Sequence, residues 1–311
     1  METLTFSQKV KEELCSNIYD SQKRLRALLC GFVRTNGTAV FRDKKTVVSL
    51  KSENAKIAKF IYQNISGLLN INCKLKFTKN KKRQTYLIEI SDGDNLIEML
   101  EISFLEGKIS KNIVFNDETI AGYLAGAFLA SGSVNSPETS NYHLEIMVNS
   151  ENYAKWLGKL FLKYKGSNIE PKIILRRGNY VLYFKRSDRI SDFLIMIGAV
   201  NCCMEFEDLR INRDFLNSTN RLTNSDMANM KKTYETGLRQ SKEIKVIINR
   251  IGLENLENDK MRQLCLLRLE NESASLGDLA ILLSKKIGFT VSKSNINHIF
   301  RSIHTLYEKV K

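Results

Sequence analysis

The sequence predicts an α+β fold in which an α-β-β-α-β-β-α unit occurs twice and an all-α domain follows. Three observations support this. Two apolar stretches, 29–37 and 124–132, share leucine and glycine at matching positions. Two marker peptides return in the same order at a nearly constant spacing: Ser-Glu-Asn at 52–54 and 150–152, and Ser-Asp at 91–92 and 187–188. Because the matching peptides occur in the same order in both halves, they indicate a duplicated unit. The hydrophobic residues after 232 recur only at helical spacing, which indicates an all-α domain.

The residues from 119 to 132 are expected to form the central helix. Asn116 or Asp117 can cap its start. Its interior contains the small residues Ala121, Gly122, Ala125 and Gly126. Glycine inside a helix costs about 1 kcal/mol relative to alanine, and close approach of another backbone is the usual compensation. We therefore expect this helix to pack against its counterpart in the first unit, the predicted helix 21–34.

Hydrophobic periodicity and turn residues place the other elements of the two units. An amphipathic helix at about 5–18 precedes the first unit. The first unit continues with strands 38–42 and 46–51, helix 53–69 after the capping residue Ser52, strands 72–78 and 85–90, and helix 92–100. The second unit continues with strands 133–136 and 142–149, helix 151–165, strands 169–176 and 180–185, and helix 188–197.

The C-terminal third begins with a polar stretch, 216–232, which we interpret as a linker running into a helix. Helices are predicted at 233–251, 259–269, 276–287 and from 293 to about 310. Ser275 and Asp278 have capping-box spacing at the start of the third of these helices. The expected domains are an N-terminal helix (1–20), two repeats (21–110 and 111–215), the linker, and a helical domain (233–311).

The two apolar stretches resemble degenerate LAGLIDADG motifs, the paired helices of homing endonucleases. The string from Asn220 to Thr233 resembles a junction found in the WhiA family of bacterial sporulation and cell-division regulators, and the likeness to that family covers essentially the whole chain. The resemblance implies two repeats related by a pseudo-dyad, with antiparallel sheets forming a saddle. It also implies a role in cell division, chromosome segregation and, in spore formers, sporulation.

A LAGLIDADG nuclease needs a carboxylate at the end of each motif helix to hold divalent metal. Those positions here are Asn36 and Ser131, and the preceding motif acids are replaced by Arg34 and Leu129. Neutral side chains cannot balance the charge of Mg²⁺, so we expect no nuclease activity. The six cysteines lack Cys-x-x-Cys spacing, and we expect neither metal nor cofactor. A homing endonuclease with residual activity is the alternative.

The last helix has one apolar stripe, from Ile296 to Leu306, and an outer face with donors and acceptors but little bulk. Two helices joined by a short glycine-containing turn suggest a helix-turn-helix, whose second helix enters the major groove. An ordinary helical hairpin with a polar face is the alternative. The expected DNA-contacting residues at about 275–308 are Lys293, Ser294, Asn297, His298, Arg301, Ser302 and Thr305.

The net charge of +14 favours an anionic partner, most simply double-stranded DNA. The exposed sheet faces and the linker would add backbone contacts. An alternative is that the lysines only protect sheet edges. The candidate backbone contacts are Lys74, Lys76, Lys81, Lys82, Arg83, Arg176, Arg177, Lys185 and Arg221.

We therefore expect a DNA-binding transcriptional regulator that is not an enzyme. A scaffold whose LAGLIDADG-like domain binds another protein, with weak DNA affinity, is a further alternative. No apolar run reaches the roughly 20 residues of a membrane helix, and the N-terminus is charged and amphipathic. We expect no membrane partner and a cytoplasmic, nucleoid-associated location.

Overall fold

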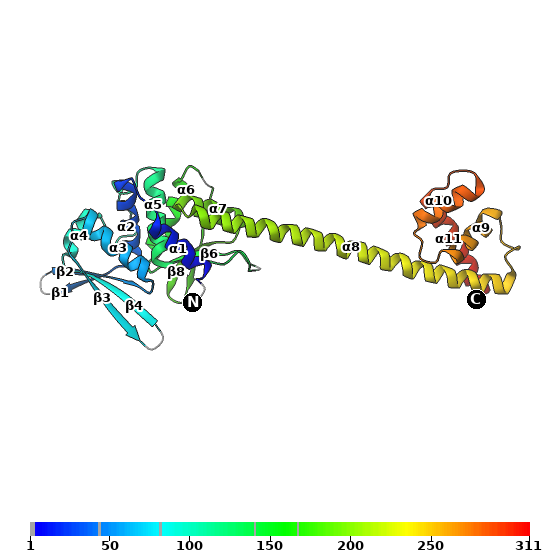
Figure 1. Cartoon of the computed structure of the whole chain (residues 1–311), viewed down its shortest axis with the longest axis horizontal. Helices are drawn as coiled ribbons and strands as arrows, with labels where there is room; N and C mark the ends of the chain where they lie inside the picture. Colours follow the sequence, from blue (N-terminus) through cyan, green and yellow to red (C-terminus); the bar gives the residue numbers. More distant parts are fainter. Residues whose placement is uncertain (1–3, 43–44, 81–82, 140, 167) are drawn as a thin grey trace. The chain divides into compact units, whose positions relative to one another are not determined.

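The computed structural model describes residues 4–42, 45–80, 83–139, 141–166 and 168–311. The chain forms two compact units, 1–213 and 214–311 (Figure 1). Each unit has its own hydrophobic core. In the described residues, no helix is both long enough and apolar enough to cross a membrane.

The first unit contains the α-β-β-α-β-β-α arrangement twice, as predicted. A short helix, α1 (Phe6–Ser16), precedes both repeats. The first repeat consists of α2 (Gln22–Asn36), β1 (Thr38–Arg42), β2 (Lys45–Ser52), α3 (Ala55–Leu68), β3 (Cys73–Asn80), β4 (Arg83–Ile90) and α4 (Gly93–Met99). The second consists of α5 (Asp117–Ser131), β5 (Gly132–Val134), β6 (Leu144–Val148), α6 (Glu151–Lys163), β7 (Lys172–Arg176), β8 (Asn179–Phe184) and α7 (Ser187–Ile197).

Each repeat has one antiparallel sheet, and the strand order is the same in both: β1-β2-β4-β3 and β5-β6-β8-β7. Helix α3 packs on strands of the first sheet and α6 on strands of the second (Figure 1). Buried side chains from both repeats belong to one hydrophobic core. The duplication predicted from three sequence matches is therefore confirmed in topology.

Helices α2 and α5 form the seam between the repeats, and their backbones touch. Asn116 caps α5 through its side chain. A Cβ atom added at Gly126 would lie 1.9 Å from the Leu28 carbonyl oxygen, and one at Gly31 would lie 2.2 Å from that of Tyr123. Any side chain at these positions would overlap the opposite backbone. The expected close packing of the two motif helices is confirmed.

The predicted linker is helical, which differs from our expectation. Helix α8 (Val200–Ile251) is continuous and includes residues 216–232. The prediction started this helix at residue 233 because the preceding stretch is polar. That stretch contains neither glycine nor proline, so nothing in it interrupts the helix. Its side chains from 214 to 232 are all exposed.

The core of the second unit lies between the end of α8 and the helices α9 (Asp259–Glu270), α10 (Leu276–Ile287) and α11 (Lys293–Val310). The capping box of Ser275 and Asp278 forms as predicted. Helix α10 ends at Gly288, whose φ of 77° lies in the left-handed region that favours glycine. This glycine begins the turn that leads into α11.

Candidate nucleic-acid interface

The last helix has a buried face and an exposed face, as its periodicity predicts. Ile296, Ile299, Phe300 and Ile303 are buried, and Leu306 is half-buried. The predicted contact residues lie on the other side. Exposed side chains are those of Lys293, Ser294, Asn297, His298, Arg301 and Thr305, and Ser302 is half-buried.

The turn between α10 and α11 is fixed by hydroxyl groups. The backbone N–H of Val291 donates to Ser284 Oγ at 2.8 Å. The N–H of Asn295 donates to Ser292 Oγ at 3.2 Å and so caps α11. Val291 is buried in the core of the unit. The start of α11 is therefore held by local hydrogen bonds as well as by packing.

The other end of α11 is anchored to α8. His304 Nδ1 lies 2.9 Å from Glu243 Oε1, and the Glu243 side chain is only 7% exposed. Arg239 Nε lies 3.9 Å from the same carboxylate oxygen. His304 is thus a contact that holds α11 against α8.

Five of the sheet residues predicted from the sequence, Lys74, Lys76, Arg176, Arg177 and Lys185, have described side chains, and all five are exposed. Two of the five are already paired. Lys76 Nζ lies 2.8 Å from Glu89 Oε2, and Arg176 Nη2 lies 2.8 Å from Glu145 Oε1. These carboxylates reduce the charge available to a DNA backbone. Lys74, Arg177 and Lys185 are exposed and form no ion pair with a described residue.

Two of the candidate residues, Lys81 and Lys82, lie outside the described residues, as does the side chain of Arg83. Arg221 lies in α8 and is exposed. The structure therefore divides the candidates into three groups: those on α11, those on the sheets, and Arg221 on α8.

Asn36 and Ser131, the residues predicted to replace nuclease carboxylates, make similar contacts. Asn36 Oδ1 accepts a hydrogen bond from the Lys51 N–H at 2.8 Å. Ser131 Oγ donates to the Met147 carbonyl oxygen at 2.6 Å. In each repeat, the end of the motif helix is thus tied to the second strand of its own sheet. No group of three or more potential metal ligands occurs in the chain as described.

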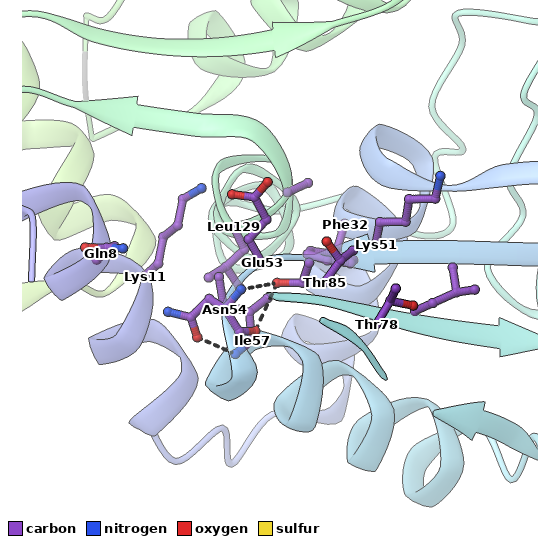
Figure 2. Close-up of a pocket in the computed structure, with 13 residues that line it drawn as sticks. Gln8, Lys11, Phe32, Lys51, Glu53, Asn54, Ile57, Thr78, Thr85 and Leu129 are labelled. Atoms are coloured by element: carbon purple, nitrogen blue, oxygen red, sulfur yellow. Dashed lines mark hydrogen bonds between the residues drawn. The ribbon is translucent and has the colours of Figure 1, made fainter. Parts of the chain in front are cut away.

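A cleft of about 790 Å³ lies beside the ends of α2 and α5 (Figure 2). Its lining includes Phe32, Leu129 and residues of α1, α3 and the first sheet. Figure 2 shows Lys11 extending from α1 toward the end of α5, where its Nζ lies 5.8 Å from the centre of the Phe128 ring. Burial lowers the pKa of the Lys11 amine to about 8. No sequence pattern distinguishes this lysine, because only the fold brings α1 to α5.

Three domain families match the chain. They are described as the WhiA N-terminal LAGLIDADG-like domain (residues 22–103), the WhiA LAGLIDADG-like domain (120–216) and the WhiA C-terminal HTH domain (219–307). The last match begins in α8, well before α9.

Similar full-length proteins bear the same family name. The probable cell division protein WhiA of Staphylococcus carnosus is 36% identical over 315 residues, covering 99% of this chain and 98% of that protein. The corresponding protein of Clostridium tetani is 34% identical, with the same shares covered. The crystal structure of full-length WhiA from Thermatoga maritima matches with a TM-score of 0.60 and 25% identity, covering 100% of this chain and 99% of that one.

Proposed function

We propose that this chain, which belongs to the WhiA family, is a DNA-binding transcriptional regulator without nuclease activity. The named relatives are probable cell division proteins. The proposed role is therefore in cell division, and the family resemblance extends the proposal to chromosome segregation and, in spore formers, sporulation. The proposed place of action is the nucleoid.

One observation carries the DNA-binding proposal: the exposed face of α11. From Lys293 to Thr305 this face contains lysine, asparagine, histidine, arginine and hydroxyl groups, and no carboxylate. Asn297 and Arg301 are four residues apart, so both side chains project from the same side of the helix. Asparagine can pair with adenine and arginine with guanine in the major groove. Lys293 and Ser294, at the helix start, suit phosphate contacts.

The sheets would add backbone contacts from Lys74, Arg177 and Lys185, because these exposed cations form no ion pair with a described residue. Such contacts strengthen binding to every duplex alike and carry no sequence information. Recognition of a particular site is therefore assigned to α11.

The proposal that the chain does not cut DNA rests on Asn36 and Ser131. Both side chains are engaged with backbone groups of the neighbouring strand, and neither supplies a negative charge. Catalysis by two metals, or by one shared metal, requires anionic ligands between the helix ends. Arg34 adds a positive charge near this position.

The first test separates recognition from general affinity. Genome-wide recovery of crosslinked DNA would supply the target sites. We expect Arg301→Ala to lower the preference for a target over an unrelated duplex by about 1–3 kcal/mol. Lys309→Ala, which removes a charge near the far end of α11, serves as the control and should preserve the preference. Specific binding that survives deletion of residues 214–311 would contradict the assignment.

The second test concerns cleavage. Purified protein should bind the same duplex in the presence and absence of Mg²⁺ and leave it intact. Metal-dependent cleavage that disappears on substitution of Asn36 or Ser131 would establish the endonuclease alternative.

A second candidate function, a protein-binding scaffold, is favoured by apolar residues on the sheets. Phe41, Phe77 and Leu175 are 73%, 54% and 65% exposed. Exposed apolar groups of this size on a sheet suit a protein partner better than a phosphate backbone. Gel shifts at increasing salt concentration discriminate between the functions. A scaffold would lose its DNA at a lower salt concentration than a regulator would, and it would show no preferred site.

A further inference from the structure

A concavity of about 410 Å³ lies where α8, the α9–α10 loop and the start of α11 meet. Three of its lining residues are cationic, four have polar uncharged side chains, and none is acidic. The residues are Asn229, Lys232, Thr233, Thr236, Arg268, Ala274, Ser275, Leu276 and Lys293. We name this concavity the basic cradle. Its composition favours an anion.

Arg268 is the buried cation of the basic cradle. It is 1% exposed, and one of its guanidinium nitrogens donates to the carbonyls of Asn271, Glu272 and Ala274 at 3.2, 3.3 and 2.7 Å. Its Nε atom is buried without a hydrogen-bond partner in the structure as described. Burial lowers the pKa of Arg268, and no acid offsets this. A buried cation with an unsatisfied donor is stabilised by an incoming anion.

Helix α8 reaches the basic cradle because of Gly237. A Cβ atom there would lie 1.9 Å from the Glu272 carbonyl oxygen. The absence of a side chain lets α8 pack directly on the loop that Arg268 holds. Lys232, Thr233 and Thr236 are thereby placed opposite Ser275, the N-cap of α10, and Lys293, the first residue of α11.

We propose that the basic cradle binds a phosphate of the DNA backbone and that Lys232 brings α8 into the DNA interface. This inference rests on the proposed function, because the same DNA would lie against α11. The phosphate oxygens would receive hydrogen bonds from the lysine amines and hydroxyl groups, and charge-assisted bonds of this kind are strong. The N-terminus of α10 is already capped by Ser275 and by the Asp278 carboxylate, which accepts from the Ser275 N–H at 3.0 Å, so the side chains of the basic cradle would hold the phosphate.

This placement also accounts for a feature that packing does not explain. The residues of α8 from 214 to 232 are exposed, yet the matched HTH domain begins at residue 219. A DNA contact at Lys232 gives this part of α8 a function within the DNA-binding unit.

The test compares two lysines of one helix in the full-length protein. Lys232→Ala removes a charge from the basic cradle, and Lys242→Ala removes an exposed charge outside it. We expect Lys232→Ala to lower the affinity for specific and for unrelated duplexes by the same factor. It should also reduce the slope of log affinity against log salt concentration by about 0.9. Lys232→Arg should restore most of the slope. Circular dichroism checks that each variant is folded.

The bound phosphate can be located with duplexes that carry one neutral methylphosphonate at a time. A single position should weaken binding of the wild-type protein and have little effect on Lys232→Ala. If Lys232→Ala matches Lys242→Ala in affinity and slope, the proposal is wrong. It is also wrong if inorganic phosphate stabilises the wild type but not Lys232→Ala while DNA binding is unchanged, because the basic cradle is then a small-anion site.

A failure of this inference can be distinguished from a failure of the proposed function. If the wild type shows no preference for any site and Arg301→Ala changes nothing, sequence recognition by α11 fails. The contribution of Lys232 to the salt slope on unrelated DNA would still be measurable in that case.

Discussion

The guanidinium carbon of Arg34 lies 4.3 Å from the centre of the Tyr153 ring, so a cation of the first repeat stacks on an aromatic residue of the second. Arg34 also donates to the carbonyl oxygens of Phe104 and Glu106, at 3.5 and 3.3 Å. Both ring and cation are buried. The Arg34 side chain therefore joins the two repeats.

Removing this cation should weaken the first unit. Arg34→Ala leaves two carbonyls without a donor and opens space beside Tyr153. We expect a loss of about 2–3 kcal/mol in the free energy of unfolding, measured by urea denaturation. Arg177→Ala, at an exposed turn, should change it by less than about 0.5 kcal/mol. Equal effects of the two substitutions would show that the stacked cation contributes little.

The seam between α2 and α5 should tolerate no side chain at Gly126. Gly126→Ala places a methyl group 1.9 Å from the Leu28 carbonyl oxygen, so the helices must separate. We expect a loss of about 3 kcal/mol or more, measured by thermal or urea unfolding. Gly67→Ala in α3 is the matched control, because its added Cβ meets nothing within 4 Å, and it should gain about 0.4–1 kcal/mol. A folded Gly126→Ala protein of normal stability would contradict the close-packed seam.

Much of the fold was predictable because local signals and tertiary contacts agree. Glycine at positions 31 and 126 is unfavourable in a helix unless another backbone packs closely against it, and α2 and α5 pack in this way. Ser275, Asp278 and Gly288 begin and end α10 where their chemistry predicts. The apolar stripe of α11 is buried as its spacing requires.

Several features that the sequence did not reveal depend on how backbone segments turn back on one another. The sequence does not show that Arg34 and Arg268 are buried, yet Arg34 is buried against the carbonyl oxygen of Glu106, 72 residues away, and Arg268 against those of the loop that follows its own helix. The pairing of Lys76 with Glu89 requires the register of β3 against β4. The helical state of 216–232 was missed because its polar residues have no core to pack against, and periodicity reports only burial.

Unpaired cations on the sheets should matter more for DNA binding than the paired ones. Replacing Lys74, Arg177 and Lys185 together by alanine should lower the affinity for specific and for unrelated duplexes by the same factor. The salt slope should fall by up to about 0.9 for each phosphate that is no longer neutralised. Replacing Lys76 and Arg176, which are paired with Glu89 and Glu145, should have a smaller effect per residue. Salt titrations of the full-length protein measure both. An unchanged slope for the triple variant would limit DNA binding to the second unit.

Lys11 should give the first unit a pH-dependent stability. Burial lowers the pKa of its amine in the folded protein to about 8, against about 10.4 in an unfolded chain. Below about pH 8 both states are protonated, so the full cost of burying the charge is present. Between about pH 8 and 10.4 the folded state loses the proton first, and the cost is progressively relieved.

Lys11→Met is therefore expected to be more stable than the wild type at neutral pH, by about 1–2 kcal/mol, and the difference should shrink toward about pH 10. Comparing the two proteins cancels the opposite effect of the buried Cys30, since burial raises the pKa of its thiol to about 12. Urea denaturation at several pH values supplies the measurement, with Lys59→Met as an exposed-lysine control. A stability difference that stays constant over this range would mean that the Lys11 amine titrates as a normal lysine and is not desolvated beside Phe128.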